Sequence, residues 1–477
     1  MRIKLFIYLL SILIELSQAF MPSVCLKNSS HLEKSSGICC PLFNHQVCGG
    51  PNRGSCQKIQ VTPNNFLYDP PVEDDRYEWP SKFFTHLCQC NLNYFGVNCG
   101  ECRLGYKGPD CTERQVKIRK NVLTLSEEER RIFRTVVHNI SQRSIDFYLP
   151  FEDDPGNSDP ATENLKWKKG NFHYFLASTH AYAGRTSLFS TDNEDCDDLR
   201  EPLYTHDTKY FLIWHRLFML LWENEFSKVV KEMYNIDDFG FPYWDWIGVE
   251  TCEVCRNDLV GEVNATSPIG RLSNESIFYD TPEFCSPPDD DRVCYSCEML
   301  GHRDFITRKI SLDAQYPTQK HFDYLINLDE FYVFEPETGT CDGFSNALEG
   351  ECSYDGRKNF PYMHNRMHNM MMDTMLGKMS SVNDPMFILH HTQIDRIFEF
   401  WLNKKNFDQN LYDASYDTPG CNIDEYLVAI IPLFRYKELY VSLEEFGVYY
   451  DGYKFGKEQS NVTYEQRDYL KKDLTRM

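Results

Sequence analysis

The sequence predicts a mainly α-helical core with long disulfide-tied loops, preceded by a small cysteine-rich domain. Ten of the 19 cysteines fall between Cys25 and Cys111, and the other nine are spread over the remainder of the 477 residues. Beyond that region, apolar residues recur at helical spacing in four stretches, separated by acidic connections rich in Pro, Ser and Cys. Because cysteine density and hydrophobic periodicity change together, we expect a domain boundary near residues 112–125.

The first 19 residues are expected to be a signal peptide. Arg2 and Lys4 precede an apolar run, and Ser17 and Ala19 provide a small-x-small cleavage site. No later stretch reaches the roughly 18–20 apolar residues that a membrane helix needs. The cysteine count also favours an oxidising compartment. We therefore expect a soluble protein, secreted or held in the lumen of a secretory vesicle.

Glycosylation sequons and charge narrow the possible partners. Asn-x-Ser/Thr sequons, which can carry N-glycans in a secreted chain, occur at Asn28, Asn139, Asn264, Asn274 and Asn461. Hydrophobic residues make up 42% of the chain and aromatic residues 14%, as in globular proteins. The formal net charge of −22 argues against nucleic acid or an anionic membrane surface as a partner.

The cysteine-rich region, residues 20–112, resembles an EGF-like domain. Residues 88–111 have the spacing C-x-C-x8-C-x2-C-x8-C, with a Gly-Tyr-x-Gly-Pro turn before the last cysteine. A domain of this size needs disulfides because its apolar core is small. A zinc ribbon is the alternative, and an extracellular setting disfavours it.

Residues 121–455 are expected to form the main domain, followed by a tail at 456–477. In the stretch 125–142, Ser126 is placed as an N-cap before glutamates in the first helical turn. The stretches 208–234, 360–376 and 384–404 also have helical periodicity.

Histidines gather in these stretches in two sets of three. His364 and His368 are four residues apart, which places two imidazoles on one helix face, and His391 follows on the next helix. The other set comprises His180, His206 and His215, the last within a helical stretch. A lone histidine on an apolar helix is usually a core residue, but six in this pattern indicate metal binding.

The ligand type selects among metals. Three neutral imidazoles suit zinc, copper, iron or nickel. A zinc protease would need Glu after the first histidine of the pair as its general base, and this chain has Asn365 there. Two three-histidine sets without a carboxylate favour a pair of redox metals that handle O₂, and copper fits best.

The motifs that surround these histidines resemble the tyrosinase family of dinuclear copper proteins. They are "GECRLGYKGPDCTER", "FLIWHRLFMLLWENEF", "FPYWDW", "NALEG", "MHNRMH" and "NDPMFILHHTQID", and the resemblance extends to about Tyr453. It implies a four-helix-bundle dicopper core. It also implies that His180, His206 and His215 bind copper A, and that His364, His368 and His391 bind copper B.

The resemblance further implies a copper-dependent monophenol monooxygenase and o-diphenol oxidase that converts tyrosine or related phenols to o-quinones with O₂. Glu349 and Asn365 match residues that orient a water to take the phenol proton. Substrates would be tyrosine, DOPA, tyramine or tyrosyl side chains, for melanin or for quinone cross-linking of extracellular protein. The alternatives are a catechol oxidase, a tyrosinase-related isomerase and an O₂-carrying haemocyanin-like protein; His390, which related proteins replace by Leu, favours the oxidase.

Several neighbours of the histidines receive secondary predictions. Asp395 is expected to hydrogen-bond an imidazole, and Asp384 either to do the same or to cap its helix. Trp214, Phe218, Trp244 and Trp246 are expected to pack around the metals. The run Met370–Met372 is interpreted as packing. If Glu351 faces the pocket, it favours amines such as tyramine over tyrosine.

Overall fold

The computed structural model describes a large part of the chain. The described residues are 21–22, 37–60, 76, 79–81, 84–91, 93–152, 165–184, 204–286, 301–311, 315–333, 343–350, 362–408, 410–411 and 423–452. The expected signal peptide (1–19), the tail (456–477) and Glu351 lie outside them. Among the described residues, no helix is long and apolar enough to cross a membrane.

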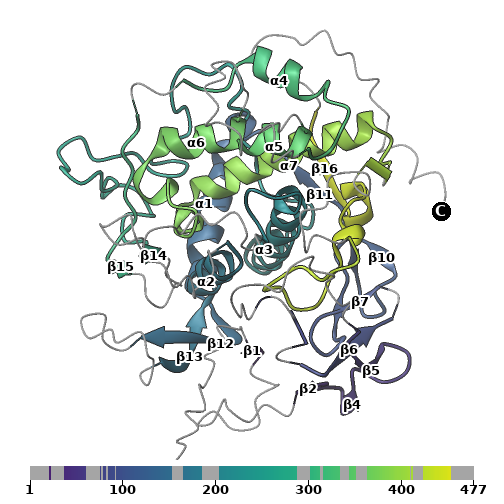
Figure 1. The fold of residues 1–477 in the computed structure, drawn as a ribbon. Helices are drawn as coiled ribbons and strands as arrows, with labels where there is room; N and C mark the ends of the chain where they lie inside the picture. Colours follow the sequence, from purple (N-terminus) through teal and green to yellow (C-terminus); the bar gives the residue numbers. More distant parts are fainter. Residues whose placement is uncertain are drawn as a thin grey trace, which may run out of the picture.

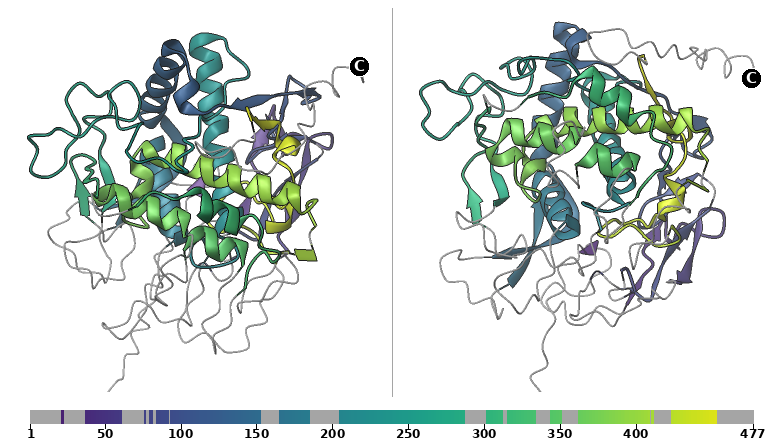
Figure 2. Two further views of the ribbon diagram at one scale, coloured as in Figure 1. Left: turned by 90° about the horizontal axis from the view of Figure 1, so that it is seen from above. Right: turned by 45° about the horizontal axis from the view of Figure 1, so that its top comes forward.

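The centre of the molecule is helical (Figures 1 and 2). Its described α-helices are α1 Glu127–Ser141, α2 Phe172–Gly184, α3 Phe211–Tyr234, α4 Gln319–Leu325, α5 Phe344–Glu349, α6 Met363–Met371 and α7 Met386–Lys404. Short 3₁₀ helices are η3 Val122–Thr124, η5 Asp373–Met375, η6 Ser381–Asn383, η7 Tyr436–Glu438 and η8 Leu443–Phe446. The prediction of a mainly helical core is confirmed, whereas the four-helix bundle stays a prediction.

Helix limits follow from local sequence. At the start of α1, the Ser126 hydroxyl accepts from the Glu129 amide (3.2 Å), and the Glu129 carboxylate accepts from the Ser126 amide (2.8 Å), as the N-cap prediction requires. The helix expected over 360–376 is shorter, because Met372 and Asp373 adopt positive φ angles of 49° and 44° and end α6. This break turns the chain back toward α6.

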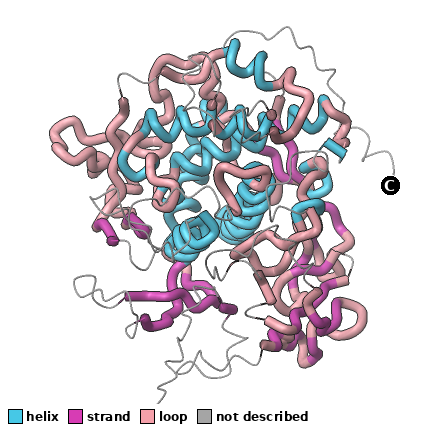
Figure 3. The backbone as a smooth tube through the Cα atoms, viewed as in Figure 1, coloured by secondary structure: helices cyan, strands magenta, loops and turns pink. Residues whose placement is uncertain are grey.

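Strands lie mostly outside the helical centre (Figure 3). They are β1 Met21–Pro22, β2 Ile38–Cys39, β3 Leu42–Phe43, β4 Gln46–Val47, β5 Gly54–Lys58, β6 His86–Cys90, β7 Tyr94–Phe95, β8 Glu101–Cys102, β9 Tyr106–Lys107, β10 Glu113–Arg114, β11 Lys117–Arg119, β12 Ser144–Glu152, β13 Leu165–Asn171, β14 Glu283–Ser286, β15 Gly301–Arg303 and β16 Val448–Tyr450. The parallel pair β11–β16 joins segments that are more than 300 residues apart in sequence.

The N-terminal region is held by disulfides, as its cysteine density predicts. The bonds described there are Cys40–Cys56, Cys48–Cys88, Cys90–Cys99 and Cys102–Cys111. The last two each close a nine-residue separation within the motif 88–111. The EGF-like interpretation and the domain limits 20–112 and 121–455 stay predictions.

A buried ionic cluster joins α3 to α7. Arg216 donates to Asp395 (2.7 Å) and to Glu399 (3.0 Å), and Arg119 on β11 donates to Asp395 (2.6 Å) and to Glu223 (2.8 Å). Both arginines are fully buried, so each carboxylate here has a cationic partner, as burial demands. The prediction that Asp395 hydrogen-bonds an imidazole is wrong, because the two guanidinium groups and the Tyr450 hydroxyl surround its carboxylate.

Candidate metal centre

Three buried histidines from α2, α3 and the loop between them form group A: His180, His206 and His215. One ring nitrogen of each lies within 4.8 Å of the others, and the Nε2 atoms of His180 and His215 are 3.3 Å apart. The long apolar first half of α3 buries His215, and α2 is buried along nearly its whole length. The structure thus brings together the first predicted set.

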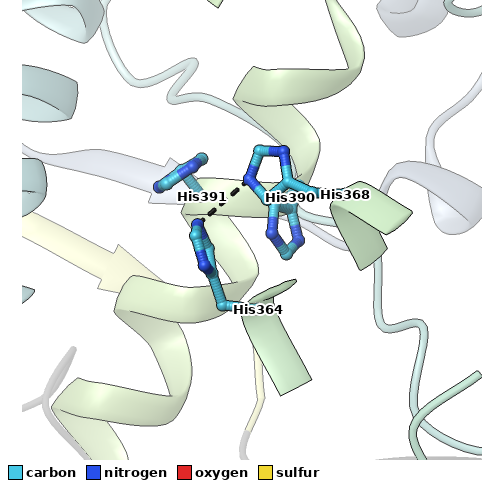
Figure 4. Close-up of side chains that lie close together, drawn as sticks. All are labelled: His364, His368, His390 and His391. Carbon is cyan, nitrogen blue, oxygen red and sulfur yellow. Dashed lines mark hydrogen bonds between the residues drawn. The ribbon is translucent and has the colours of Figure 1, made fainter. Parts of the chain in front are cut away.

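Four histidines from α6 and α7 form group B: His364, His368, His390 and His391 (Figure 4). The four-residue spacing in α6 brings the Nε2 atoms of His364 and His368 to 3.0 Å, as helical geometry predicts. The two adjacent histidines of α7 complete the group. The second predicted set is therefore assembled, with His390 as an additional member.

The two groups face each other across the helical core. The rings of His215 and His391 are stacked with their centroids 4.6 Å apart, and the ring centroids of His206 and His364 are 6.5 Å apart. His391 is therefore the member of the α7 pair that reaches group A. His390 instead lies 5.8 Å from Trp246.

Hydrogen bonds at Nδ1 orient several of the rings. The carbonyl oxygens of Phe211 and Met375 face Nδ1 of His215 and of His368, respectively. The Asn365 side-chain oxygen lies 2.8 Å from Nδ1 of His364. A carbonyl can only accept, so these three imidazoles carry their proton on Nδ1, and their Nε2 lone pairs point into the groups.

Burial keeps all seven imidazoles neutral. It lowers the pKa of His215 to about 3 and that of His368 to about 4, and it lowers the pKa values of the other five as well. Both ring nitrogens of His391 and Nδ1 of His180 are buried without a hydrogen-bond partner. Neutral imidazoles gathered in this way fit a cation in each group, and in group B the Nε2 lone pairs of His364 and His368, 3.0 Å apart, would otherwise repel.

Of the four aromatic residues predicted to pack around the metals, three lie beside the histidines. Trp214 lies 5.8 Å and Phe218 6.0 Å from the His180 ring, and Trp246 packs on His390. Trp244 is fully buried but contacts Tyr316. Met370 and Met371 are buried in the core, in agreement with the packing interpretation. This shell limits the access of water to the histidines.

Asp384 has two roles at the start of α7. Its Oδ1 accepts from the Met386 amide (2.8 Å), which is the expected capping interaction. Both carboxylate oxygens also accept from the buried guanidinium of Arg308, at 2.5 and 2.6 Å. These contacts fix the start of α7, the helix that carries His390 and His391.

Glu349 and Asn365 lie at the edge of the histidine groups. Glu349 ends α5 with 1% of its surface exposed, and its Oε1 accepts from the Asp207 amide at 2.9 Å. Gly350 follows with a φ of 111°, and a Cβ on it would lie 3.1 Å from the Asn365 amide nitrogen. The end of α5 and the start of α6 thus pack closely, which places Glu349 and Asn365 on adjoining helix ends.

Three features of the site were not predicted. The Thr205 hydroxyl lies 2.9 Å from Nδ1 of His206, the Met375 carbonyl orients His368, and Lys378 forms an ion pair with Asp207 beside His206. The break after α6 creates the last two. The Thr205 and Met375 contacts are local, whereas the Lys378–Asp207 pair joins residues 171 apart in sequence, which no sequence spacing encodes. The adjacency of Asp207 to a predicted ligand was a usable signal.

Comparison with known proteins places this arrangement in a family. A family model described as "Tyrosinase: Common central domain of tyrosinase" matches residues 170–404, a range that contains both groups. The tyrosinase of Gallus gallus is 30% identical in an alignment of 467 positions that covers 93% of this chain and 84% of the relative. The chain belongs to the tyrosinase family. Tyrosinases are dinuclear copper enzymes, and the two histidine groups fit that metal content.

Other members of the tyrosinase family are similarly distant. The Bos taurus tyrosinase is 30% identical, over 91% of this chain and 82% of the relative. The "5,6-dihydroxyindole-2-carboxylic acid oxidase" of Gallus gallus is 27% identical, over 87% of this chain and 80% of the relative. Among solved structures, a polyphenol oxidase from Thermothelomyces thermophila superposes with a TM-score of 0.47 at 15% identity, over 72% of this chain and 89% of that one.

Proposed function

We propose that this protein is a copper-dependent monophenol monooxygenase and o-diphenol oxidase that converts tyrosine or related phenols to o-quinones. The observation that carries the proposal is the pair of facing groups of buried, neutral histidines, whose lone pairs converge. The relatives from Gallus gallus and Bos taurus that are 30% identical support it, because both are named tyrosinase.

The ligand assignment follows the two groups. His180, His206 and His215 would hold one copper, and His364, His368 and His391 the other. His391 is preferred over His390 because its ring stacks on His215 of group A. A bound copper pair supplies the activation of O₂. The protein's own contribution is to keep the imidazoles neutral, oriented and shielded from water.

Glu349 and Asn365 are assigned to the phenol proton. A phenol has a pKa near 10, so hydroxylation at neutral pH needs a base. Glu349 supplies a buried carboxylate that the Asp207 amide holds in place, and Asn365 lies on the first turn of α6, close to Gly350 at the end of α5. We propose that this pair holds the water that accepts the proton, while the Asn365 oxygen orients His364.

We infer the chain's setting from the sequence. The expected signal peptide, the disulfides and the sequons support a secreted glycoprotein or one held in a secretory vesicle. Among the described sequons, Asn264 and Asn274 are exposed, as glycan attachment requires. Quinones made there would serve melanin formation or the cross-linking of extracellular protein.

A second candidate is a diphenol oxidase that does not hydroxylate monophenols. The similarity to the dihydroxyindole carboxylic acid oxidase, over 87% of this chain, favours this alternative. Glu349 distinguishes the two functions, because only monophenol hydroxylation requires its carboxylate, whereas Asn365 also orients His364.

The experiment is a quinone assay on purified, copper-loaded protein with L-tyrosine and then L-DOPA in air. Absorbance is followed beside a copper count, with His368→Ala as the control. Quinone from both substrates, lost in the control, supports the proposal. Quinone from L-DOPA alone favours the second candidate. No quinone from either, at full copper loading, overturns both.

A further inference from the structure

The segment Met375–Met379 crosses the edge of the site from group B to group A. At one end the Met375 carbonyl accepts from Nδ1 of His368, and at the other the Met379 backbone lies against His180. His368 therefore fixes one end of this segment, and the other end lies next to group A. It carries a single ionisable side chain, Lys378.

Lys378 and Asp207 form an ion pair at this edge. The Lys378 ammonium lies 2.5 Å from the Asp207 carboxylate, and the side chains are 60% and 27% exposed. Asp207 follows the group A histidine His206, and its amide donates to Glu349. The pair thus lies beside both a predicted copper ligand and the predicted base, with its charges in contact with solvent.

Such a pair is complementary to a zwitterion. Exposed ion pairs contribute little free energy. Lys378 and Asp207 can therefore separate at small cost, and each can pair with the opposite charge of a ligand. A free aromatic amino acid has one carboxylate and one ammonium on the same carbon, at the end of the molecule opposite its phenol. A phenol directed toward the histidines leaves this end at the edge of the site.

We propose that Lys378 and Asp207 form a subsite for the α-carboxylate and the α-ammonium of a free aromatic amino acid. The inference rests on the proposed function and narrows its substrate class. Tyramine offers only the ammonium, and a tyrosyl residue within a protein offers neither charge. Free amino acids are therefore preferred, in contrast to the preference for amines predicted from Glu351.

The test compares four phenols that differ only in these charges: 4-ethylphenol (neutral), tyramine (cation), 3-(4-hydroxyphenyl)propionate (anion) and L-tyrosine (zwitterion). Values of kcat/KM are taken relative to 4-ethylphenol within each copper-loaded protein, which cancels general damage to the site. Wild type is compared with Lys378→Gln and Asp207→Asn. Asn tolerates the left-handed backbone of Asp207 (φ 53°). Lys231→Gln, which breaks the exposed pair with Asp237, is the matched control.

Lys378→Gln is expected to lower the relative kcat/KM for L-tyrosine and for the propionate about threefold to fivefold, and not that for tyramine. Asp207→Asn is expected to lower the values for tyramine and L-tyrosine. The change should lie in KM, since these charges are bound equally in the ground and transition states, and should shrink at high salt.

The subsite is overturned if Lys378→Gln has the same relative kcat/KM values as wild type and Lys231→Gln. The proposed function is unaffected by that result as long as 4-ethylphenol is oxidised. A change that appears equally for all charged substrates, or only in kcat, also overturns the subsite, because it indicates a structural role. A wild type that oxidises none of the four phenols overturns the proposed function and the subsite with it.

Discussion

Groups A and B hold equivalent imidazoles by different means. In group B, His364 and His368 are neighbours on α6, and their Nδ1 partners, Asn365 and Met375, lie within seven residues. In group A, His180 and His206 are 26 residues apart, and they meet only because α2, α3 and the residues just before α3 lie together in the fold. Group B is thus formed largely by local geometry, and group A by tertiary structure.

Although groups A and B are built differently, we expect both to be necessary for activity. His180→Ala and His364→Ala should each remove one copper and reduce quinone formation to background, since O₂ chemistry on a metal pair needs both metals. Metal analysis and the L-DOPA assay measure this. His138→Ala, on α1 and outside both groups, should retain two coppers and full activity. Activity in either ligand variant would contradict the pairing.

The buried ionic cluster between α3 and α7 should contribute much of the free energy of unfolding. Arg216 on α3 is fully buried and donates to Asp395 and Glu399 of α7. Arg216→Met leaves these carboxylates short of a cation and should lower the free energy of unfolding by about 3–5 kcal/mol. Urea unfolding of the metal-free protein measures this.

The matched control is Arg131→Met, which breaks an exposed pair with Glu128 on α1. Its unfolding midpoint should equal that of wild type. Equal midpoints for Arg216→Met and Arg131→Met would show that the buried cluster does not stabilise the α3–α7 contact.

Acid should destabilise the metal-free protein through both groups. The pKa values of these histidines are lowered in the fold, so the unfolded chain binds more protons once the pH falls below about 6.5. Stability is therefore lost from there down toward pH 4 for His368 and pH 3 for His215. Because several groups titrate together, the loss should exceed about 1.4 kcal/mol per pH unit.

Unfolding at pH 7, 6 and 5 measures that slope, and His215→Gln should reduce it by removing one titrating group. A stability that stays constant between pH 7 and 5 would contradict the burial of neutral imidazoles.

The contacts that orient the imidazoles at Nδ1 should differ in strength between group A and group B. The Asn365 oxygen can only accept and therefore fixes the tautomer of His364, whereas the Thr205 hydroxyl beside His206 can donate or accept. Asn365→Leu should lower copper affinity or activity about 10- to 100-fold, and Thr205→Val should have a smaller effect. Copper competition titrations compare them, and a larger loss in Thr205→Val would reverse the assignment.

The same difference explains what could be predicted from the sequence. The four-residue spacing predicted the α6 pair, and Ser126 with Glu129 predicted the start of α1, because both depend on local geometry. The predicted partner of Asp395 was wrong because Arg119, 276 residues away in sequence, reaches it only in the fold. The left-handed Met372 and Asp373 end α6 early, although neither residue is a typical helix breaker.

The central claim is that the two histidine groups hold a copper pair, and anomalous diffraction from crystals of the copper-loaded protein tests it most directly. Two copper peaks are expected, one within coordination distance of His180, His206 and His215 and the other of His364, His368 and His391. A single peak, or a copper bound by His390 in place of His391, would contradict it.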